Sequence, residues 1–183
     1  ARSAYAEAAL RSPNNPLVPL ALARLDALAG DVSSARANIV KALELKNNYT
    51  EAYFTLAQLE VAANNIPGAI KSVEAATVVD PMNAGLYFQL GVLEYNQRDF
   101  AGAAKALEKA VALVPDYANA KYFLGLSYYQ IGKKEEAVKQ FEEISATNPD
   151  NQDVKIILSN IKDGKALFPN TGTTDKSKPP VEE

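Results

Sequence analysis

The chain has 183 residues, of which 48% are hydrophobic, and its formal net charge is −3. This length and apolar content allow a sizeable core, and the slightly acidic balance gives no electrostatic footprint for nucleic acid. The sequence contains no His and no Cys, which excludes the common zinc sites, thiol nucleophiles and His-based catalytic triads. Its apolar stretches are too short to cross a bilayer, so direct membrane insertion by this segment is not expected.

A 34-residue period organises the predicted elements. Pro81, Pro115 and Pro149 are spaced by this period. With position 1 placed at Pro16, the sequence divides into repeats 1 to 4, which cover residues 16–49, 50–83, 84–117 and 118–151. Position 7 is Leu in every repeat, position 8 is Ala or Gly, and position 20 is Ala. A fixed period of this length predicts an array of helical hairpins rather than a single compact core.

Residues 1–15 continue the same register backwards. Tyr5 falls at position 24, Ala8 at position 27 and Pro13 at position 32. We therefore expect this segment to form the second helix of a preceding repeat whose first helix is absent. The sequence is accordingly interpreted as a fragment of a longer protein.

Each full repeat has the pattern of two helices. Positions 4, 7, 8 and 11 share one helical face, and positions 20, 24 and 27 share a face of a second helix. The small residues at positions 8 and 20 allow the two backbones to approach closely. Position 24 is always apolar, as a residue that faces the partner helix should be (Ile39, Val73, Leu107 and Phe141).

Turn and capping residues separate the two helices. Asp31 and Asp99 are placed to accept hydrogen bonds from the first free amides of the second helix, and Pro67 falls in a first turn, where a missing N–H has little effect. Pro19 at position 4 suggests that the first helix of repeat 1 begins late.

After repeat 4, residues 152–168 predict one more helix. Val154, Ile157 and Ile161 recur at helical spacing, and the opposite side is polar, which is typical of a helix that caps a repeat array. Residues 169–183 are rich in Thr, Lys, Pro and Glu. We expect this tail to be disordered, because it cannot bury enough apolar surface to offset its ordering entropy.

Glu135-Glu136 and Glu142-Glu143 could be paired catalytic carboxylates. Three lysines lie beside them in the sequence, and Glu135 and Lys139 are spaced i, i+4. A solvated, salt-bridged face explains them better. Because no phosphate-binding loop is present either, the sequence predicts no enzyme and no cofactor.

The repeats resemble tetratricopeptide repeats. That motif prefers Leu at position 7, a small residue at 8, Tyr at 11, Ala at 20, a large apolar residue at 24 and Pro at 32. The main departure is position 11, where three repeats have an acid and only Tyr128 matches (Asp26, Glu60 and Glu94). The resemblance implies an all-α, right-handed superhelical solenoid of antiparallel helix pairs and a role in protein interaction.

The resemblance also implies where a partner would bind, because positions 2, 5, 9, 12 and 13 of the first helices line the inner face of such arrays. Carried onto this chain, they indicate a groove of aromatic residues with interspersed amides, which suits an extended peptide or a helix. The candidate groove residues are Leu20, Arg24, Phe54, Gln58, Phe88, Val92, Tyr95, Asn96, Asn119, Tyr122, Leu126 and Tyr129. For Phe54, Phe88, Tyr122 and Tyr129, exposure in the groove and packing between repeats remain equal alternatives.

The carboxylate clamp of chaperone-binding repeat domains does not fit. The five clamp positions, counted from repeat 2, hold Phe54, Gln58, Gln89, Asn119 and Phe123 rather than the required Lys, Asn and Arg set. The repeats therefore do not predict a chaperone adaptor.

Two functional hypotheses remain. The first is a module that binds a protein or peptide partner, and the second is a scaffold that self-associates or docks on its own upstream domain. Residues 117–126 also resemble the C-terminal repeats of bacterial membrane proteins of the glycan-polymerase and O-antigen-ligase type, which would make this chain a soluble appendage. The sequence indicates neither the compartment nor the partner.

Overall fold

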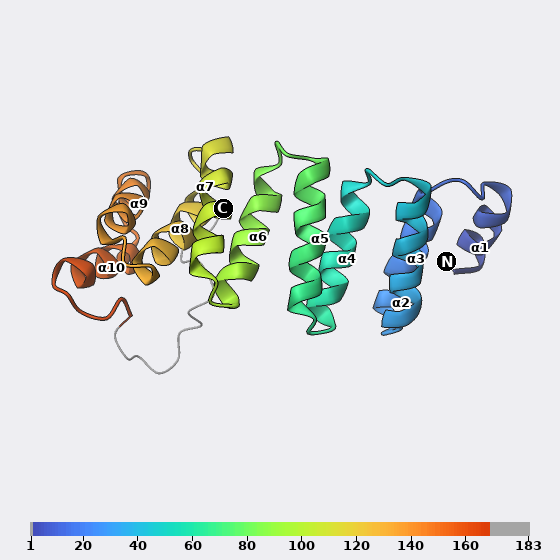
Figure 1. Ribbon diagram of the computed structural model, residues 1–183, viewed down its shortest axis with the longest axis horizontal. Helices are drawn as coiled ribbons and strands as arrows, with labels where there is room; N and C mark the ends of the chain where they lie inside the picture. The colour runs from blue at the N-terminus through green and yellow to red at the C-terminus, as the bar shows by residue number, and fades with distance from the viewer. Residues whose placement is uncertain (1, 169–183) are drawn as a thin grey trace. The chain divides into compact units, whose positions relative to one another are not determined.

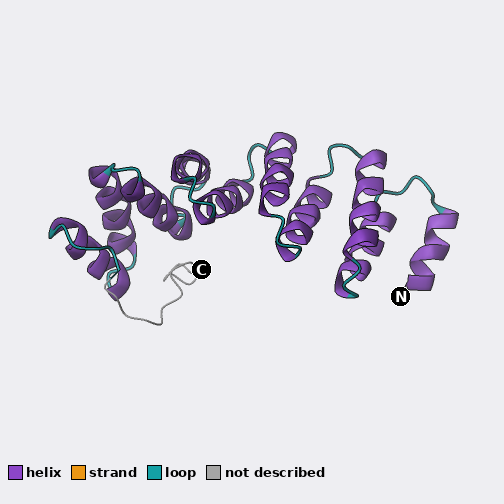
Figure 2. Ribbon diagram, turned by 60° about the horizontal axis from the view of Figure 1, so that its bottom comes forward, coloured by secondary structure: helices purple, strands orange, loops and turns teal. Residues whose placement is uncertain are grey.

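Residues 2–168 are described by the structure, a computed structural model in which every regular element of this range is an α-helix (Figure 1; Figure 2). The ten helices are α1 (Arg2–Arg11), α2 (Leu17–Leu28), α3 (Val32–Leu45), α4 (Thr50–Ala62), α5 (Ile66–Val79), α6 (Ala84–Asn96), α7 (Phe100–Leu113), α8 (Ala118–Gln130), α9 (Lys134–Thr147) and α10 (Gln152–Lys162).

The helices form hairpins that follow the 34-residue register. The pairs α2–α3, α4–α5, α6–α7 and α8–α9 are repeats 1 to 4, and in each pair the two helices pack along their length. First helices α4, α6 and α8 begin at position 1, whereas α2 begins one residue later, at Leu17, with Pro19 in its first turn. The all-α, helix-pair fold expected from the sequence is confirmed.

The chain divides into two compact bodies. Among the described residues, the N-terminal body extends to Asn83 and contains helices α1 to α5, and the C-terminal body begins at Ala84 and contains helices α6 to α10. Each body has its own hydrophobic core. Leu20, Ala23, Ile39 and Leu59 are among the buried residues of the first core, and Leu107, Phe123 and Phe141 are among those of the second.

Close packing at position 8 holds the two helices of a repeat together. A Cβ atom added to Gly91 would lie 2.5 Å from Cγ of Leu107, and one added to Gly125 would lie 2.8 Å from Cζ of Phe141. These glycines therefore face the position 24 side chains of the second helix, as the sequence predicts. The partners are complementary in shape, because Gly91 and Gly125 oppose Leu107 and Phe141, whose side chains are not branched at Cβ. Repeats 1 and 2 instead place Ala at position 8 and a β-branched residue at position 24.

Two of the acids at position 11 accept hydrogen bonds from asparagine side chains, one in the middle of the second helix and one at its N-cap. Asp26 accepts from Asn38 at 2.8 Å, and Glu60 accepts from Asn65 at 2.7 Å. In repeat 3, Oε1 of Glu94 lies 3.1 Å from the place that a Cβ of Gly102 would take, which puts this acid beside the first turn of α7. An acid at this position therefore replaces the Tyr of the repeat motif by contacting the partner helix through polar groups.

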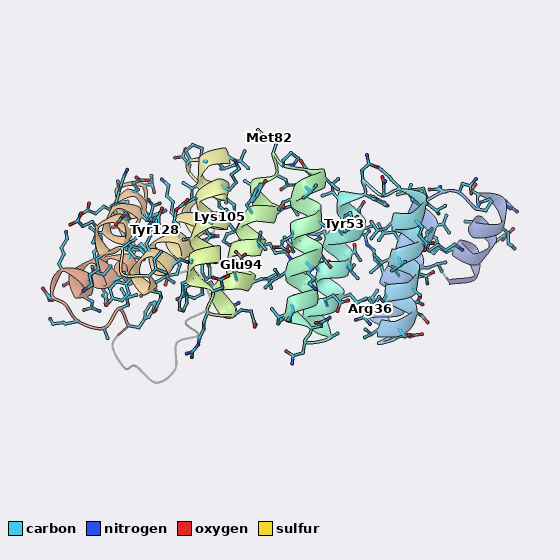
Figure 3. All side chains as sticks on the ribbon, viewed as in Figure 1. Arg36, Tyr53, Met82, Glu94, Lys105 and Tyr128 are labelled. Atoms are coloured by element: carbon cyan, nitrogen blue, oxygen red, sulfur yellow. The ribbon has the colours of Figure 1, made fainter. Side chains whose placement is uncertain are left out.

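Glu60 also forms an ion pair between repeats. Arg36 of α3, which is labelled in Figure 3, donates from Nε to Oε1 of Glu60 at 2.8 Å and from Nη2 to Oε2 at 2.9 Å. The Glu60 side chain is 7% exposed and that of Arg36 is 45% exposed. The hydrogen bond from Arg36 holds the pKa of Glu60 below its ordinary value of 4.5, and the bond from Asn65 acts in the same direction.

The predicted caps are present. Asp31 accepts a hydrogen bond from the Ser34 amide at 3.0 Å, and Asp99 accepts one from the Gly102 amide at 3.0 Å. Pro67 lies in the first turn of α5, as expected. These bonds satisfy amides that would otherwise lack a partner at the start of α3 and α7.

The last helix is shorter than the expected 152–168. Helix α10 ends at Lys162, because Gly164 adopts a φ of 69°, which ends the helical path. The chain then folds back, so that the Asn160 side chain donates to the Leu167 carbonyl at 3.0 Å and Leu167 is buried. The predicted disorder of residues 169–183 concerns a segment outside the described residues. Within residues 2–168, no helix combines the length and hydropathy that a bilayer span requires.

Replacing Gly125 by Ala is expected to lower the free energy of unfolding by about 1–3 kcal/mol, because the added methyl group overlaps the Phe141 ring. At an exposed helical site the same change stabilises by about 1 kcal/mol. The double variant Gly125→Ala/Phe141→Val recreates the Ala57–Val73 pair of repeat 2, and it should be more stable than the sum of the single effects predicts. Chemical denaturation measures this coupling, and strictly additive effects would contradict it.

Glu60→Gln is expected to lower the free energy of unfolding at pH 7 by about 1–2 kcal/mol, since it breaks an ion pair with one buried member. The matched control is Glu51→Gln. Glu51 pairs with Arg24 at 2.6 Å, but both side chains are 51% exposed, so the cost should stay below about 1 kcal/mol.

The effect of Glu60 should also depend on pH. Its folded-state pKa is lowered, so its stabilising contribution is complete above the unfolded value near 4.5 and is lost as the pH falls through the folded value. Denaturation at pH 7, 5 and 3 should therefore show wild type and Glu60→Gln converging at the lowest pH. A difference that stays constant over this range would contradict the prediction.

Candidate protein-binding surfaces

The acidic pairs on α9 form surface ion pairs. Glu142 pairs with Lys162 at 3.3 Å, and Glu143 pairs with Lys121 at 2.7 Å, while Glu135 and Glu136 are exposed. Over the described range, no group of three or more acids is placed to hold a metal ion. The arrangement of these carboxylates is that of a salt-bridged surface, as the sequence indicates.

First helices of successive repeats lie next to each other within each body. Helix α2 contacts α4, and helix α6 contacts α8. Residues at the implied binding positions meet across these contacts, as Arg24 at position 9 and Glu51 at position 2 of the next repeat do. We call the side chains at these positions of α2 and α4 the N-terminal first-helix surface. The corresponding side chains of α6, α8 and α10 form the C-terminal first-helix surface.

The N-terminal first-helix surface includes four of the predicted site residues. Leu20 is buried, with 2% of its area exposed, and belongs to the core. Arg24 and Gln58 are exposed, although Arg24 is engaged by Glu51. Phe54 is 36% exposed, so its ring is available at the surface.

Four apolar side chains of this surface are open to solvent. Leu17 is 59% exposed, Leu28 is 86% exposed and Val61 is 42% exposed, in addition to Phe54. Such side chains gather at binding sites more often than at random on a protein surface. The N-terminal surface is therefore mainly aliphatic.

The C-terminal first-helix surface includes the other eight predicted residues, at two depths. Phe88, Val92, Tyr95 and Tyr129 are half-buried, and Asn96 is exposed. The remaining three are buried in the described conformation, namely Asn119 at 9% exposure, Tyr122 at 3% and Leu126 at 0%. The buried side chains form a base beneath the half-buried ones.

Phe123, which the inner-face positions do not include, is at the centre of that base. It is 1% exposed, and its ring centroid lies 6.0 Å from Phe88, 5.6 Å from Tyr95 and 5.7 Å from Tyr122. All three contacts are edge-to-face, the geometry that aromatic rings prefer. Phe123 therefore fixes the orientation of two half-buried rings that reach the surface.

Burial governs the chemistry of Tyr122. Desolvation raises the pKa of its hydroxyl far above the usual value, and the nearby Tyr95 and Asp153 act in the same direction. The hydroxyl therefore stays protonated at physiological pH and can only be a neutral donor or acceptor.

Helix α10 supplies two surface residues that the sequence-based site omits. Counted one period beyond Ala118, Gln152 is position 1, so Asp153 and Ile156 occupy positions 2 and 5. Asp153 is exposed, and Ile156 is 45% exposed. The 34-residue register contains the signal for these two residues, but an interpretation of α10 as a cap alone does not use it.

Buried amide oxygens without a donor among the described residues lie on both first helices of the C-terminal body, and a third, Oε1 of Gln140, lies on α9. Neither Oε1 of Gln89 nor Oδ1 of Asn119 has a hydrogen-bond donor among the residues that the structure describes. A buried acceptor without a donor is costly, at about 1–3 kcal/mol. Both oxygens have almost no exposed area in the described conformation, so they are a cost to stability rather than a contact open to a ligand.

The chain belongs to the tetratricopeptide repeat family. The family model described as tetratricopeptide repeat matches residues 54–116 and 88–152, which together span more than half of the sequence. Members of this family are protein-interaction modules. No curated protein matches the chain at a significant level.

Solved structures of tetratricopeptide repeat proteins share the fold. The crystal structure of YrrB, described as a repeat protein with an unusual peptide-binding site, is similar with a TM-score of 0.76 and 22% identity over 90% of this chain and 84% of that chain. The crystal structure of MamA gives a TM-score of 0.70 and 24% identity, over 82% and 88% of the two chains. PilF of Pseudomonas aeruginosa gives 0.63 and 22%, over 82% and 68%.

Proposed function

We propose that the chain is a non-catalytic protein-binding module that holds a peptide or a helix of a partner on its first-helix surfaces. The observation that carries this proposal is the C-terminal first-helix surface. On this surface, four half-buried side chains pack against the buried aromatic base (Phe88, Val92, Tyr95 and Tyr129).

The physical basis is the rigidity of these side chains together with their remaining exposed area. The contacts with Phe123 already restrict Phe88 and Tyr95, so binding costs little further side-chain entropy. Their exposed parts can still bury apolar area against a partner. Exposed Asn96 and Gln130 can pair with the backbone of the bound segment.

A few such anchors can supply the binding free energy of a peptide complex with micromolar affinity. Micromolar affinity corresponds to about 8 kcal/mol, and truncation of a central aromatic anchor commonly costs about 2 kcal/mol or more. The peptide-binding site named for YrrB supports the proposal by analogy of fold only.

Selection of a displayed library of random 12-residue peptides against the immobilised protein provides the test. Phe88→Ala and Tyr129→Ala should each weaken binding of the enriched peptides by about tenfold or more, because each removes an aromatic anchor. Val114→Ala, which truncates an apolar side chain that is 44% exposed after α7, is the matched control and should leave affinity unchanged.

Circular dichroism and thermal melting must show that all three variants remain helical. Full retention of affinity in both aromatic variants would show that this surface is not where peptides bind. Failure of the library to enrich any peptide would contradict peptide binding itself.

A second candidate function, scaffolding by self-association or by docking on an adjoining domain, is favoured by the N-terminal first-helix surface. Its exposed Leu17, Leu28, Phe54 and Val61 are aliphatic or aromatic, and burial against a second apolar surface would stabilise such an assembly. The resemblance of residues 117–126 to the repeat regions of glycan-polymerase and O-antigen-ligase proteins extends this candidate to an appendage of a membrane protein.

This candidate predicts that sedimentation velocity shows a mass that rises with protein concentration. Val61→Lys should then restore a monomer, because it places a charge within the contact. Val40→Lys is the matched control, since Val40 is 45% exposed but lies on the second helix α3. A wild-type protein that stays monomeric at all concentrations would remove self-association from consideration.

A further inference from the structure

We propose that the open face of α1 pairs with the open face of α10 of a second copy, so that the two helices complete a repeat between molecules. This inference goes beyond the proposed function, because the faces consist of positions 24, 26 and 27 of α1 and positions 4, 7 and 8 of α10, which belong to neither first-helix surface. It follows from the register, the exposure and the charges of the two helices.

Helix α10 has the placement of a first helix. Counted from Gln152 as position 1, it packs on α9, the second helix of repeat 4 (Figure 1). Lys162, at position 11, pairs with Glu142 at 3.3 Å. In the same way, Tyr128 at position 11 of repeat 4 donates to Glu108 at 2.8 Å. Because both acids occupy position 25 of the preceding repeat, α10 continues the array as the first half of a further repeat.

The face of α10 that a second helix would cover is open. Position 8 is buried in all four repeats, whereas Ser159, which occupies this position of α10, is exposed. Lys155 at position 4 is also exposed, and Leu158 at position 7 is half-buried. Within residues 2–168, the helix that α10 contacts is α9 alone. The side chains that would face a second helix are therefore accessible to one.

Helix α1 shows the complementary exposure. Tyr5 falls at position 24, where the other second helices bury an apolar side chain to 1% exposure or less, yet Tyr5 is 39% exposed. Ala8 at position 27 is half-buried, whereas this position is at most 1% exposed in repeats 1 to 4. Among the described helices, α1 contacts only α2, beside which it lies (Figure 1). The face that a first helix covers in the full repeats is thus open on α1.

The two open faces match in size. Pairing would place Ser159 opposite Tyr5, as Gly125 lies opposite Phe141 in repeat 4, so a small residue at position 8 again faces a ring at position 24. Because serine has the Cβ that Gly125 lacks, the Tyr5 ring must tilt away further than the Phe141 ring does, which an exposed side chain can do. The ring would then bury apolar area that the single chain leaves in water.

The charges match in register as well. In repeat 4, Lys121 at position 4 and Glu143 at position 26 form an ion pair at 2.7 Å. Lys155 occupies position 4 of α10, and Glu7 occupies position 26 of α1. The ion pair of Glu7 with Arg11 on the same helix has exposed members, at 61% and 78%, so Glu7 can change partners at little cost. Pairing of the helices would therefore join Lys155 and Glu7 by the contact that already holds repeat 4.

A second copy can supply the missing helix to each face. Helices α2, α4, α6 and α8 are already paired within their repeats, so α10 is the helix of first-helix register whose pairing face is open among those described. The contact is heterologous, because α1 and α10 are different surfaces. Its repetition would link copies into rings or open chains.

Sedimentation velocity of the 183-residue chain tests the inference. A contact of one helix pair is a small interface, so the protein should be examined from about 10 µM to about 1 mM, and its average mass should rise over this range. Ser159→Gln should weaken the association by at least about fivefold, because the longer side chain overpacks the crossing. Ser33→Gln, at an exposed site on α3, is the matched control and should have no effect.

Charge reversal tests the register of the pairing. Glu7→Lys and Lys155→Glu should each weaken association about three- to tenfold, because each sets like charges against each other, and the loss should shrink at high salt. The double variant Glu7→Lys/Lys155→Glu restores opposite charges, so it should associate within about twofold of wild type. Glu74→Lys, at an exposed acid on α5, is the charge-matched control and should leave association unchanged.

The outcomes separate this inference from the functions proposed above. Circular dichroism must show that all variants remain helical. If Val61→Lys abolishes association and Ser159→Gln does not, the N-terminal first-helix surface is the contact and the end pairing is wrong. A wild-type chain that stays monomeric, or a double charge variant that associates as weakly as the single ones, would also overturn it. Peptide binding is measured with the library and stands or fails independently.

Discussion

The close crossing of the two helices in each repeat is the constraint on which the rest of the structure depends. A Cβ added to Gly125 would overlap the ring of Phe141, so the backbone of α8 must run directly against a side chain of α9. Every repeat resolves this contact with a different pair of side chains: Leu107 and Phe141, which are not β-branched, lie opposite glycine, and the β-branched Ile39 and Val73 belong to repeats with alanine at position 8. Because the shapes of the two partners change together, the helix-pair geometry can persist while the side chains change.

A second constraint is the polar contact that the residue at position 11 makes with the second helix. Asp26 accepts a hydrogen bond from Asn38 in the middle of α3, Glu60 accepts one from Asn65 at the N-cap of α5, and Arg36 also donates to Glu60. In repeat 4 the same position holds Tyr128, whose hydroxyl donates to Glu108 at 2.8 Å. Repeat 4 also begins its second helix after Lys133, which makes no side-chain cap. Repeats 1 to 3 thus combine an acid at position 11 with a side-chain cap at the start of the second helix. Repeat 4, which has Tyr128 at position 11, has neither.

Local chemistry made much of this structure predictable. The caps at Asp31 and Asp99 and the glycine column follow from residues a few positions apart or from one repeated contact. The depth of the site residues could not be predicted in this way. Tyr122 and Leu126 occupy positions that line the inner face in the repeat motif, yet neighbouring side chains bury both of them. Helix α10 ends before the expected residue 168 because Gly164 adopts a positive φ, and the folded-back Leu167 then adds to the buried apolar surface.

The division between buried and half-buried aromatics gives the binding proposal its physical logic. The contacts with Phe123 restrict Phe88 and Tyr95, so these rings cannot reorient to fit many different ligands. Recognition therefore also depends on the polar groups beside the rings. Lys134 of α9 places Nζ 6.0 Å from the centroid of the Tyr129 ring, whereas Lys121 is buried and engaged by Glu143. The exposed part of each ring and the groups next to it, rather than the buried base, thus decide what a ligand can contact.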